Sequence, residues 1–354
     1  MIERLNGNLH REMTEMKHTL RHLLIVCVLL THAYVSADES SQFLGEKPGQ
    51  WAFKYINPTT TPDEVRFKTN VSELAEWFRR NVPILAQSKG FNMQVYVTGS
   101  WDDHYRMSRA NYGTRADMTF YFQLFMKDGR VWTAELPSAS YYGFAINSTH
   151  AAVMPHGTFS YFSNLNDDPK REKAINAAAT KMDEVRIVFP FREELAAGVH
   201  VYENPGSSGY TVIVFNPDRP SFWIPVTVKE LAAIYLEYYA LRPSDQILLQ
   251  ELKKEIAQIP EGEMDAQACM GHDSNIVFRV NGKSQGLPLS RFNPDYWDRS
   301  LPPSAIQFMT FWYPQMSPED MEVHLKRFGY PVRSQILVNQ IDWKGVAGRI
   351  MKGK

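Results

Sequence analysis

The chain has 354 residues, of which 44% are hydrophobic and 13% aromatic, and its formal net charge at pH 7 is -1. This composition is that of a globular protein, and the length predicts one large domain or two. Basic residues form no stripe in the sequence, so we expect no nucleic-acid partner.

Residues 1–37 have the features of a secretory signal peptide. Residues 17–30 combine a basic start with an uninterrupted apolar run, and Val35 and Ala37 stand where a signal peptidase reads, at the third and first positions before Asp38. The apolar run is shorter than the roughly 20 residues that a membrane span needs. We therefore expect a secreted or periplasmic protein, cut between Ala37 and Asp38, with no membrane span in the mature chain.

The start of the chain and its division into domains follow from similar signals. Residues 1–15 are polar, of mixed charge, and precede the basic part of the signal peptide, so we expect Met16 to be the true initiator. The mature chain is expected to form an α+β region over residues 38–216 and another over residues 217–354. The proline-punctuated residues 216–225 mark the boundary. One continuous domain is the alternative.

The first elements predicted in the mature chain are a short strand, a helix and a longer strand. Residues 51–55 favour the short strand. Asn70 and Glu73 form a capping pair, which predicts a helix that starts there and that Pro83 kinks or divides. Residues 91–98 alternate between apolar and polar side chains, which is typical of a strand.

A β-hairpin is predicted next. Residues 118–125 and 130–134 flank Asp128 and Gly129, a dipeptide suited to a two-residue turn. Residues 137–168 are rich in Tyr, Phe, Ser and Asn and predict a long irregular region. Loops of this length within a compact domain are often functional.

The rest of the chain alternates between helical and strand-like patterns. Helices are predicted over residues 169–183, 228–241, 244–259 and 317–329, with a short helix or strand at 332–341. Strands are predicted over residues 184–189, 199–203, 210–215, 276–280 and 305–312. The helices between residues 228 and 259 form a helical hairpin. The fold class is therefore α+β, with a mixed or antiparallel sheet, or sheets, and helices packed on them.

Two local clusters carry groups used in catalysis. Asp103 stands beside His104, and a carboxylate next to an imidazole can orient it as a general base. Cys269 and His272 are three residues apart, and a thiolate–imidazole pair can act as a nucleophile. Adjacent loop residues do not generally point together, so a solvated turn and a chance spacing are the alternatives.

Cysteine and histidine usage limits the other chemistry. Cys27 would leave with the signal peptide, so Cys269 could form no intramolecular disulfide; we expect a buried, inert thiol, with a reactive thiol as the alternative. No two histidines after Asp38 have the i, i+4 spacing of a helical metal site. The sequence also lacks the motifs of common zinc peptidases, α/β-hydrolases, P-loop enzymes and Rossmann dehydrogenases. We expect no metal and no cofactor.

Two aromatic loops are the candidates for ligand binding. Their residues are Tyr141, Tyr142, Phe144, Asp295, Tyr296 and Trp297. In the second loop, Asp295 and Asp298 beside two aromatic rings are the groups that a glycosidase or a lectin would use. The alternative is an ordinary turn whose aromatic side chains fill the core.

Three functions fit these features. The leading hypothesis is an exported, non-catalytic protein that binds a small molecule, a glycan or an envelope protein through its aromatic loops. The second is an exported hydrolase with a histidine and carboxylate site. The third is a structural or assembly component of the cell envelope.

Overall fold

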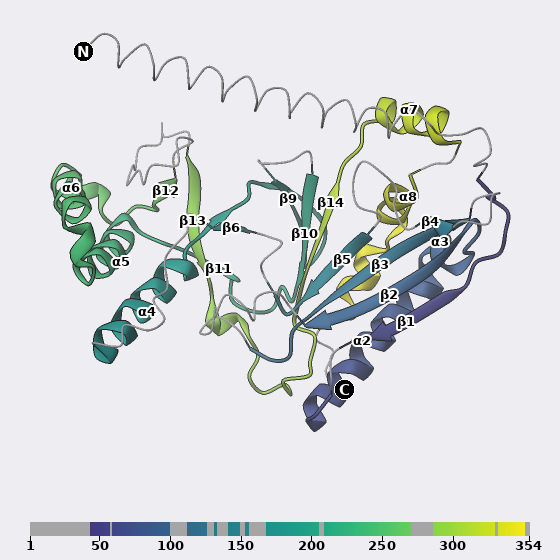
Figure 1. Ribbon diagram of the computed structural model, residues 1–354, viewed down its shortest axis with the longest axis horizontal. Helices are drawn as coiled ribbons and strands as arrows, with labels where there is room; N and C mark the ends of the chain where they lie inside the picture. The colour runs from purple at the N-terminus through teal and green to yellow at the C-terminus, as the bar shows by residue number, and fades with distance from the viewer. Residues whose placement is uncertain are drawn as a thin grey trace, which may run out of the picture.

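The computed structural model describes residues 43–56, 59–99, 112–125, 131–132, 141–148, 153–155, 168–204, 209–270, 286–329 and 332–350. These residues form an α+β fold with a large mixed sheet and a smaller antiparallel one, as the sequence predicts (Figure 1). No helix among them is long and apolar enough to cross a membrane.

The main sheet has nine strands in the described part of the chain. Its path runs through β1 (Trp51–Tyr55), β2 (Phe91–Gly99), β3 (Ala116–Phe125), β5 (Tyr141–Ile146), β14 (Phe308–Pro314), β10 (Gly209–Phe215), β9 (Val199–Asn204) and β8 (Phe191–Ala196), and β4 (Val131–Trp132) pairs with β3. β1 runs parallel to β2, and the other pairs are antiparallel. Strands from both sides of residue 216 therefore share one sheet.

Helices cover one face of the main sheet. They are α2 (Pro62–Asn81), α3 (Pro83–Ala86), α8 (Arg333–Gln340) and α9 (Trp343–Ala347). Their buried side chains form one core with the inward residues of β2 and β3, such as Val95 and Phe120. α7 (Pro318–Phe328) begins at the cap Ser317 and ends at Gly329, which has a φ of 72°, so both predicted ends are confirmed.

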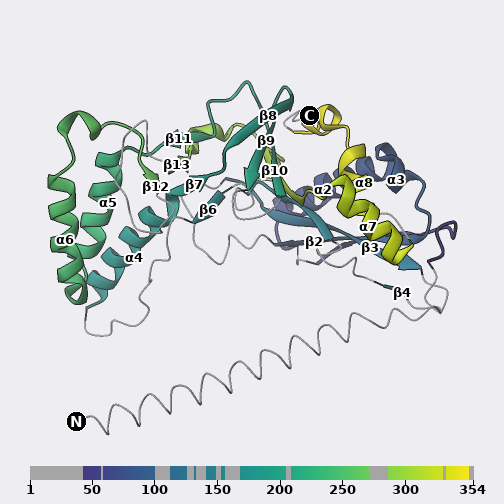
Figure 2. The same cartoon turned by 90° about the horizontal axis from the view of Figure 1, so that it is seen from above.

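A second group of helices lies at the other end of the molecule (Figure 2). α4 (Pro169–Glu184), α5 (Val228–Ala240) and α6 (Gln246–Ala257) pack against the small sheet, with the 3-10 turns η3 (Pro243–Asp245) and η4 (Glu261–Glu263). That sheet consists of β11 (Trp223–Pro225), β13 (Leu287–Phe292), β7 (Arg186–Val188) and β6 (Val153–Pro155), with β12 (Cys269–Met270) on β13. The predicted helical hairpin is α5 followed by α6.

Three local predictions are corrected. The first helix begins at Pro62, because Thr61 and Glu64 form a capping box there; Asn70 lies inside the helix and donates to the Ser304 carbonyl at 2.8 Å. The region expected to be irregular, residues 137–168, contains β5 and β6. β8 has no counterpart among the predicted strands. The strand expected at residues 276–280 lies outside the described residues.

Asn147 connects the end of β5 to the segment before β14. It is 1% exposed and has a φ of 53°, a conformation that few residues other than glycine adopt. Its Nδ2 donates to the carbonyls of Thr114 and Ala305, each at 2.9 Å. Its Oδ1 accepts from the backbone N–H groups of Gln307, at 2.8 Å, and Phe308. Both ends of the amide are therefore used in a buried place.

We predict that Asn147→Asp destabilises the protein by at least about 2 kcal/mol, because a carboxylate cannot donate to two buried carbonyls. Urea unfolding followed by circular dichroism measures the loss. Asn92→Asp is the matched control, since the Asn92 Oδ1 only accepts from the Gln50 N–H, at 2.9 Å, and a carboxylate oxygen accepts equally well. Equal stability of the two variants would contradict the role given to Asn147.

Candidate functional site

The catalytic candidates lie mostly outside the described residues. This holds for Asp103, His104 and His272. Cys269, at the start of β12, is a half-buried free thiol whose Sγ lies 3.9 Å from the Gln267 carbonyl oxygen. Among the described residues, no group of three or more His, Cys, Asp or Glu side chains is arranged to hold a metal ion.

The first aromatic candidates belong to a central strand of the sheet. Tyr142 and Phe144 are buried in β5 and point into the helix-covered core, where the Phe144 ring centroid lies 4.6 Å from that of Phe311. Tyr141 begins the same strand, paired with Tyr121. The structure thus places Tyr142 and Phe144 where a ligand arriving from solvent does not reach them.

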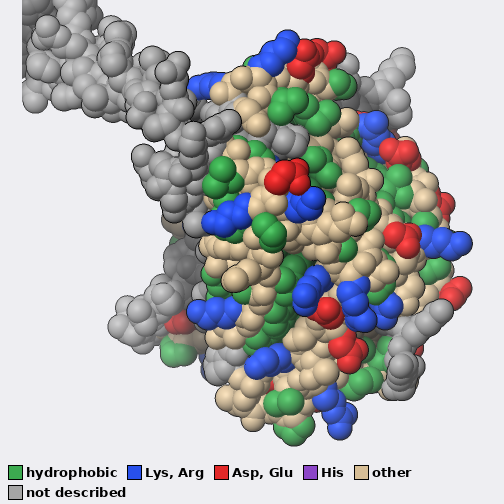
Figure 3. Space-filling model, turned by 90° about the vertical axis from the view of Figure 1, so that its right-hand side faces the viewer, with side chains coloured by type: hydrophobic (Ala, Val, Ile, Leu, Met, Phe, Trp, Pro, Cys, Tyr) green, Lys and Arg blue, Asp and Glu red, His purple; other side chains and the backbone are tan. Residues whose placement is uncertain are grey.

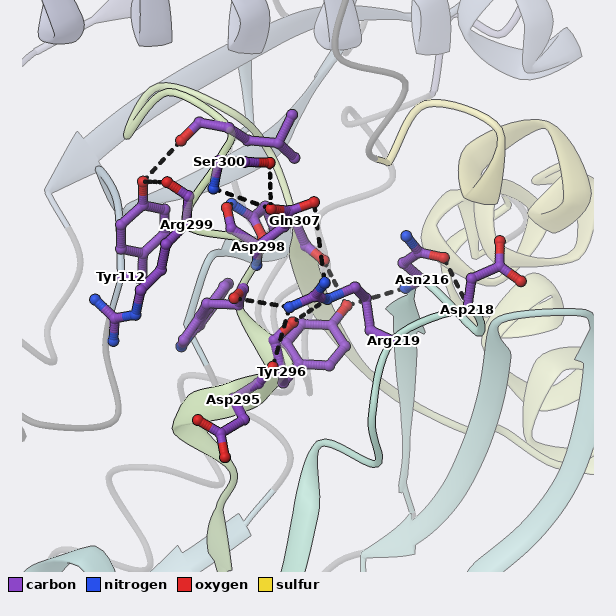
Figure 4. Close-up of polar contacts among 12 residues, drawn as sticks. Tyr112, Asn216, Asp218, Arg219, Asp295, Tyr296, Asp298, Arg299, Ser300 and Gln307 are labelled. Atoms are coloured by element: carbon purple, nitrogen blue, oxygen red, sulfur yellow. Dashed lines mark hydrogen bonds and ion pairs between the residues drawn. The ribbon is translucent and has the colours of Figure 1, made fainter.

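Two rings of the second aromatic set are also core residues. Tyr296, in the 3-10 turn η5 (Pro294–Tyr296), is 1% exposed, and Trp297 is 2% exposed. Both pack against Phe308 on the face of the main sheet that the α2 side does not cover. Asp295 is exposed, and its carboxylate points away from the neighbouring polar groups (Figure 4).

Arg219 holds this turn in place (Figure 4). Its guanidinium donates to three consecutive carbonyl oxygens, those of Asp295, Tyr296 and Trp297, at 3.0, 2.8 and 2.9 Å. Asp298 is 4.0 Å from Arg219 and accepts from Ser300; the Ser300 hydrogen bonds, with a smaller effect of Arg219, lower the pKa of Asp298.

The hydroxyl of Tyr296 completes that network. It donates to the Gln307 carbonyl at 2.6 Å and accepts from the Asn216 N–H at 2.9 Å. Burial raises the pKa of Tyr296, so its hydroxyl stays protonated at neutral pH. These polar groups bind one another and the backbone, and such a satisfied arrangement stabilises a joint between elements.

His200 is a half-buried histidine on β9. Phe191 and Phe215 place their ring centroids 5.1 and 4.6 Å from its ring, and Glu194 stands opposite it on β8. Burial lowers the pKa of His200 below its ordinary value, and Glu194 opposes that shift with a smaller effect. The folded protein therefore favours the neutral imidazole.

A pH dependence of stability follows from the lowered pKa of His200. Below about pH 6.5 the unfolded chain binds a proton at His200 more readily than the folded chain does, so the free energy of unfolding falls as the pH falls. We predict that His200→Gln makes the loss of stability between pH 7 and pH 5 smaller than in the parent. Urea unfolding at both pH values measures the difference, and an unchanged loss would contradict it.

The face of β2, β3 and β5 opposite the described helices, with the end of β14 around Trp312, presents a set of polar and aromatic side chains. Along β2 and β3, buried residues on the helix side alternate with half-buried residues on this side. We call the set the polar face. It consists of Asn92, Gln94, Tyr96, Thr98, Asp117, Thr119, Tyr121, Gln123, Gly143 and Trp312.

Trp312 is the most exposed member of this set. It is 36% exposed although β14 lies inside the sheet, and its ring stacks on no other described ring. Its partner across the strand pair is Gly143, which in turn pairs with Thr119. A Cβ at Gly143 would lie 3.2 Å from the Met118 carbonyl oxygen, so a larger residue fits poorly at this position. Because glycine has no side chain, no side chain of β5 stands beside the Trp312 indole at this pair.

Hydrogen bonds order the other half of the polar face. The Tyr96 hydroxyl donates to Gln94 Oε1, and Gln94 Nε2 donates to Gln123 Oε1 at 2.9 Å. The rings of Tyr96 and Tyr121 pack edge to face with centroids 5.3 Å apart. These side chains stand on paired strands, which fixes them better than a loop would.

The sequence contained part of this signal. The alternation of residues 91–98 and 118–125 predicts two strands with polar residues on one side. The sequence also predicts a strand that includes Trp312, but nothing in the neighbouring residues shows which face of the sheet Trp312 occupies. Comparison with protein-family models, curated proteins and solved structures finds no match.

Proposed function

We propose that the chain is an exported, non-catalytic binding protein whose ligand lies on the polar face of the main sheet. The observation that carries the proposal is the exposed indole of Trp312 beside Gly143, on a strand inside the sheet. An indole in such a place offers a large apolar surface at low conformational cost, which is why tryptophan is enriched at binding sites.

Polar alternation alone would not support a site, because an antiparallel sheet with one solvated face is ordinarily polar on that face. The polar face differs in its composition. Besides Trp312 it carries two tyrosines, two glutamines and a glycine, and Asp117 is its one carboxylate. Aromatic rings with amides and hydroxyls are the groups that orient a ligand by stacking and hydrogen bonding.

This proposal places the ligand on a face of the sheet, whereas the sequence hypothesis placed it at the two aromatic loops. Tyr142, Phe144, Tyr296 and Trp297 support the cores instead. The chemistry expected of the ligand is the same as the sequence suggested, because rings and neutral polar groups still do the recognition. Export is supported by the basic, apolar and small-residue order of residues 17–37.

We predict that Trp312→Ala weakens ligand binding at least tenfold, or about 1.4 kcal/mol, because an aromatic anchor contributes that much or more. Intrinsic fluorescence titrations and calorimetry against a panel of soluble oligosaccharides and peptides measure it. Trp51→Ala is the matched control: it also removes an indole from this sheet, but a half-buried one on the helix-covered side.

The two variants separate binding from stability. Binding lost in Trp312→Ala but kept in Trp51→Ala, at similar unfolding free energies, supports the site. Equal binding by both would show that the ligand lies elsewhere. Mass spectrometry of the recovered ligands checks the non-catalytic part of the proposal, since a cleaved product would favour the hydrolase instead.

For export, we predict that expression in a host with a secretory pathway yields a processed protein beginning at Asp38. N-terminal sequencing identifies the first residue. Ala37→Arg should block processing, because a large charged residue does not fit the site that the peptidase reads, whereas Ser36→Ala should not. A processed parent that still contains residues 17–37 would overturn the assignment.

A further inference from the structure

The polar face is longer than the part around Trp312. A row of directly paired residues crosses five strands and runs from Lys54 through Tyr96, Thr119 and Gly143 to Trp312. Four steps between neighbouring strands give the row a length of about 19 Å. A ligand that touches both ends therefore extends across the strands and is longer than a single small ring.

Lys54 stands at the outer end of this row. In the parallel pair with β2 it lies opposite Tyr96, while its neighbours Phe53 and Tyr55 pack against the core on the other side. Its side chain is exposed and has no ion-pair partner in the described part of the chain. The side of the molecule where β1 lies shows acidic and basic side chains interspersed (Figure 3).

The two ends of the row from Lys54 to Trp312 differ in charge. Lys54 gives a cation at the β1 edge, and Trp312 gives an apolar surface at β14. Asp117 lies one row further along β3, opposite Thr98. A ligand with an acidic group at one end and an apolar ring face at the other complements this arrangement.

Within the row and beside it, the polar face offers hydrogen-bond donors and acceptors. The Tyr96–Gln94–Gln123 chain uses the Gln123 oxygen as an acceptor and leaves the N–H groups of Gln123 for a ligand. The Tyr96 oxygen keeps its acceptor capacity. A hydroxyl group can both donate and accept a hydrogen bond, so the hydroxyls of a ligand can accept from amide N–H groups and donate to phenol oxygens.

The backbone of these strands is engaged within the sheet. β2, β3 and β5 each have a paired neighbour on both sides, so an extended peptide could not add a strand here. Recognition on this face depends on side chains, and those side chains are amides, hydroxyls and rings.

We propose that the ligand is an acidic glycan lying across the strands, with a sugar ring on Trp312 and a carboxylate at Lys54. This inference rests on the binding function proposed above and names the class of its ligand. The ring faces of sugars carry C–H groups that pack on an indole, and their rims carry hydroxyls for Tyr96 and Thr119, which lie in the row.

A matched pair of probes tests the charge: an oligogalacturonate and its full methyl ester, which has the same sugars without the negative charges. With the purified full chain at low salt, we expect the acid to bind five- to tenfold more tightly than the ester. Lys54→Gln should remove that preference and leave the affinity for the ester unchanged. The preference should also shrink at high salt, because exposed charges are screened.

Lys68→Gln is the control variant. Lys68 lies on α2, with its Nζ 5.7 Å from the centre of the Tyr55 ring on the helix side of the sheet, so its loss should not alter the preference for the acid. It changes the net charge of the protein as Lys54→Gln does. A similar effect of both variants would indicate general charge attraction and overturn the assignment of Lys54.

The remaining outcomes separate the two proposals. If both probes bind equally and Trp312→Ala abolishes both, the polar face is a binding site but its ligand is not selected for charge. If an oligoglutamate of equal length binds as tightly as the acid, the glycan class is wrong. If no probe binds and Trp312→Ala changes no titration of the broader panel, the proposed function itself fails.

Discussion

The insertion of β14 between β5 and β10 is the interaction on which the rest of the structure depends. Seven residue pairs join β14 to β10, and four join it to β5. Without this strand, the sheet would separate into one half containing β1 to β5 and another containing β8 to β10. Alternation along β14 also divides its side chains between two cores, since Met309 and Phe311 face the helices and Phe308 faces the aromatic cluster around Tyr296.

The segment that leads into β14 is held by contacts with both halves. Asn147 follows β5 and binds the backbone of residues 305–308, while Arg219 and Tyr296 tie the loop after β10 to the turn that precedes β14. These polar contacts fix the register of the strand. A slip by one residue would exchange Phe311 with Trp312 and bury the indole in the helix-covered core.

Elements with strong local signals were predictable from the sequence. The caps Thr227 and Ser317 and the stop at Gly329 mark helix ends because each satisfies a backbone group within a few residues. The pairing of β3 with β4 was predictable from two β-favouring runs close together in the sequence, but its register, with Phe125 opposite Val131, differs by one residue from that of a two-residue turn at Asp128 and Gly129. A plausible capping pair can still be wrong. Asn70 and Glu73 lie inside the helix, because Thr61 and Glu64 form a capping box nine residues earlier.

Strands that depend on distant partners could not be predicted in the same way. β5 contains consecutive aromatic residues and a glycine, so its sequence shows no alternation, and it is a strand because β3 and β14 flank it. β8 is charged and exposed, and it exists as an edge strand paired with β9. Charged side chains and the two irregularities in its register are features that keep an edge strand from pairing with other chains.

The same limit applies to the candidate site. Trp297 and Trp312 each stand next to a tyrosine in the sequence, yet one is 2% and the other 36% exposed. Both rings lie on the same side of the main sheet, but Trp297 is enclosed by the aromatic cluster around Phe308, whereas Trp312 stands four residues further along β14, opposite Gly143. These surroundings depend on strand pairing over more than 100 residues of sequence. Polar alternation in β2 and β3 located half of the polar face, and the pairing of Trp312 with Gly143 supplied the rest.

The position of β14 along the chain has a consequence for how the protein acquires its fold. β14 is the last strand of the described chain, and residues 216–307 separate it from its neighbour β10. The central pairing of the main sheet therefore has to wait until the ribosome has made nearly all of the chain, and long-range pairing of this kind is slow. For a protein exported as proposed above, such late closure keeps the emerging polypeptide open enough to be threaded through a membrane before it folds on the far side.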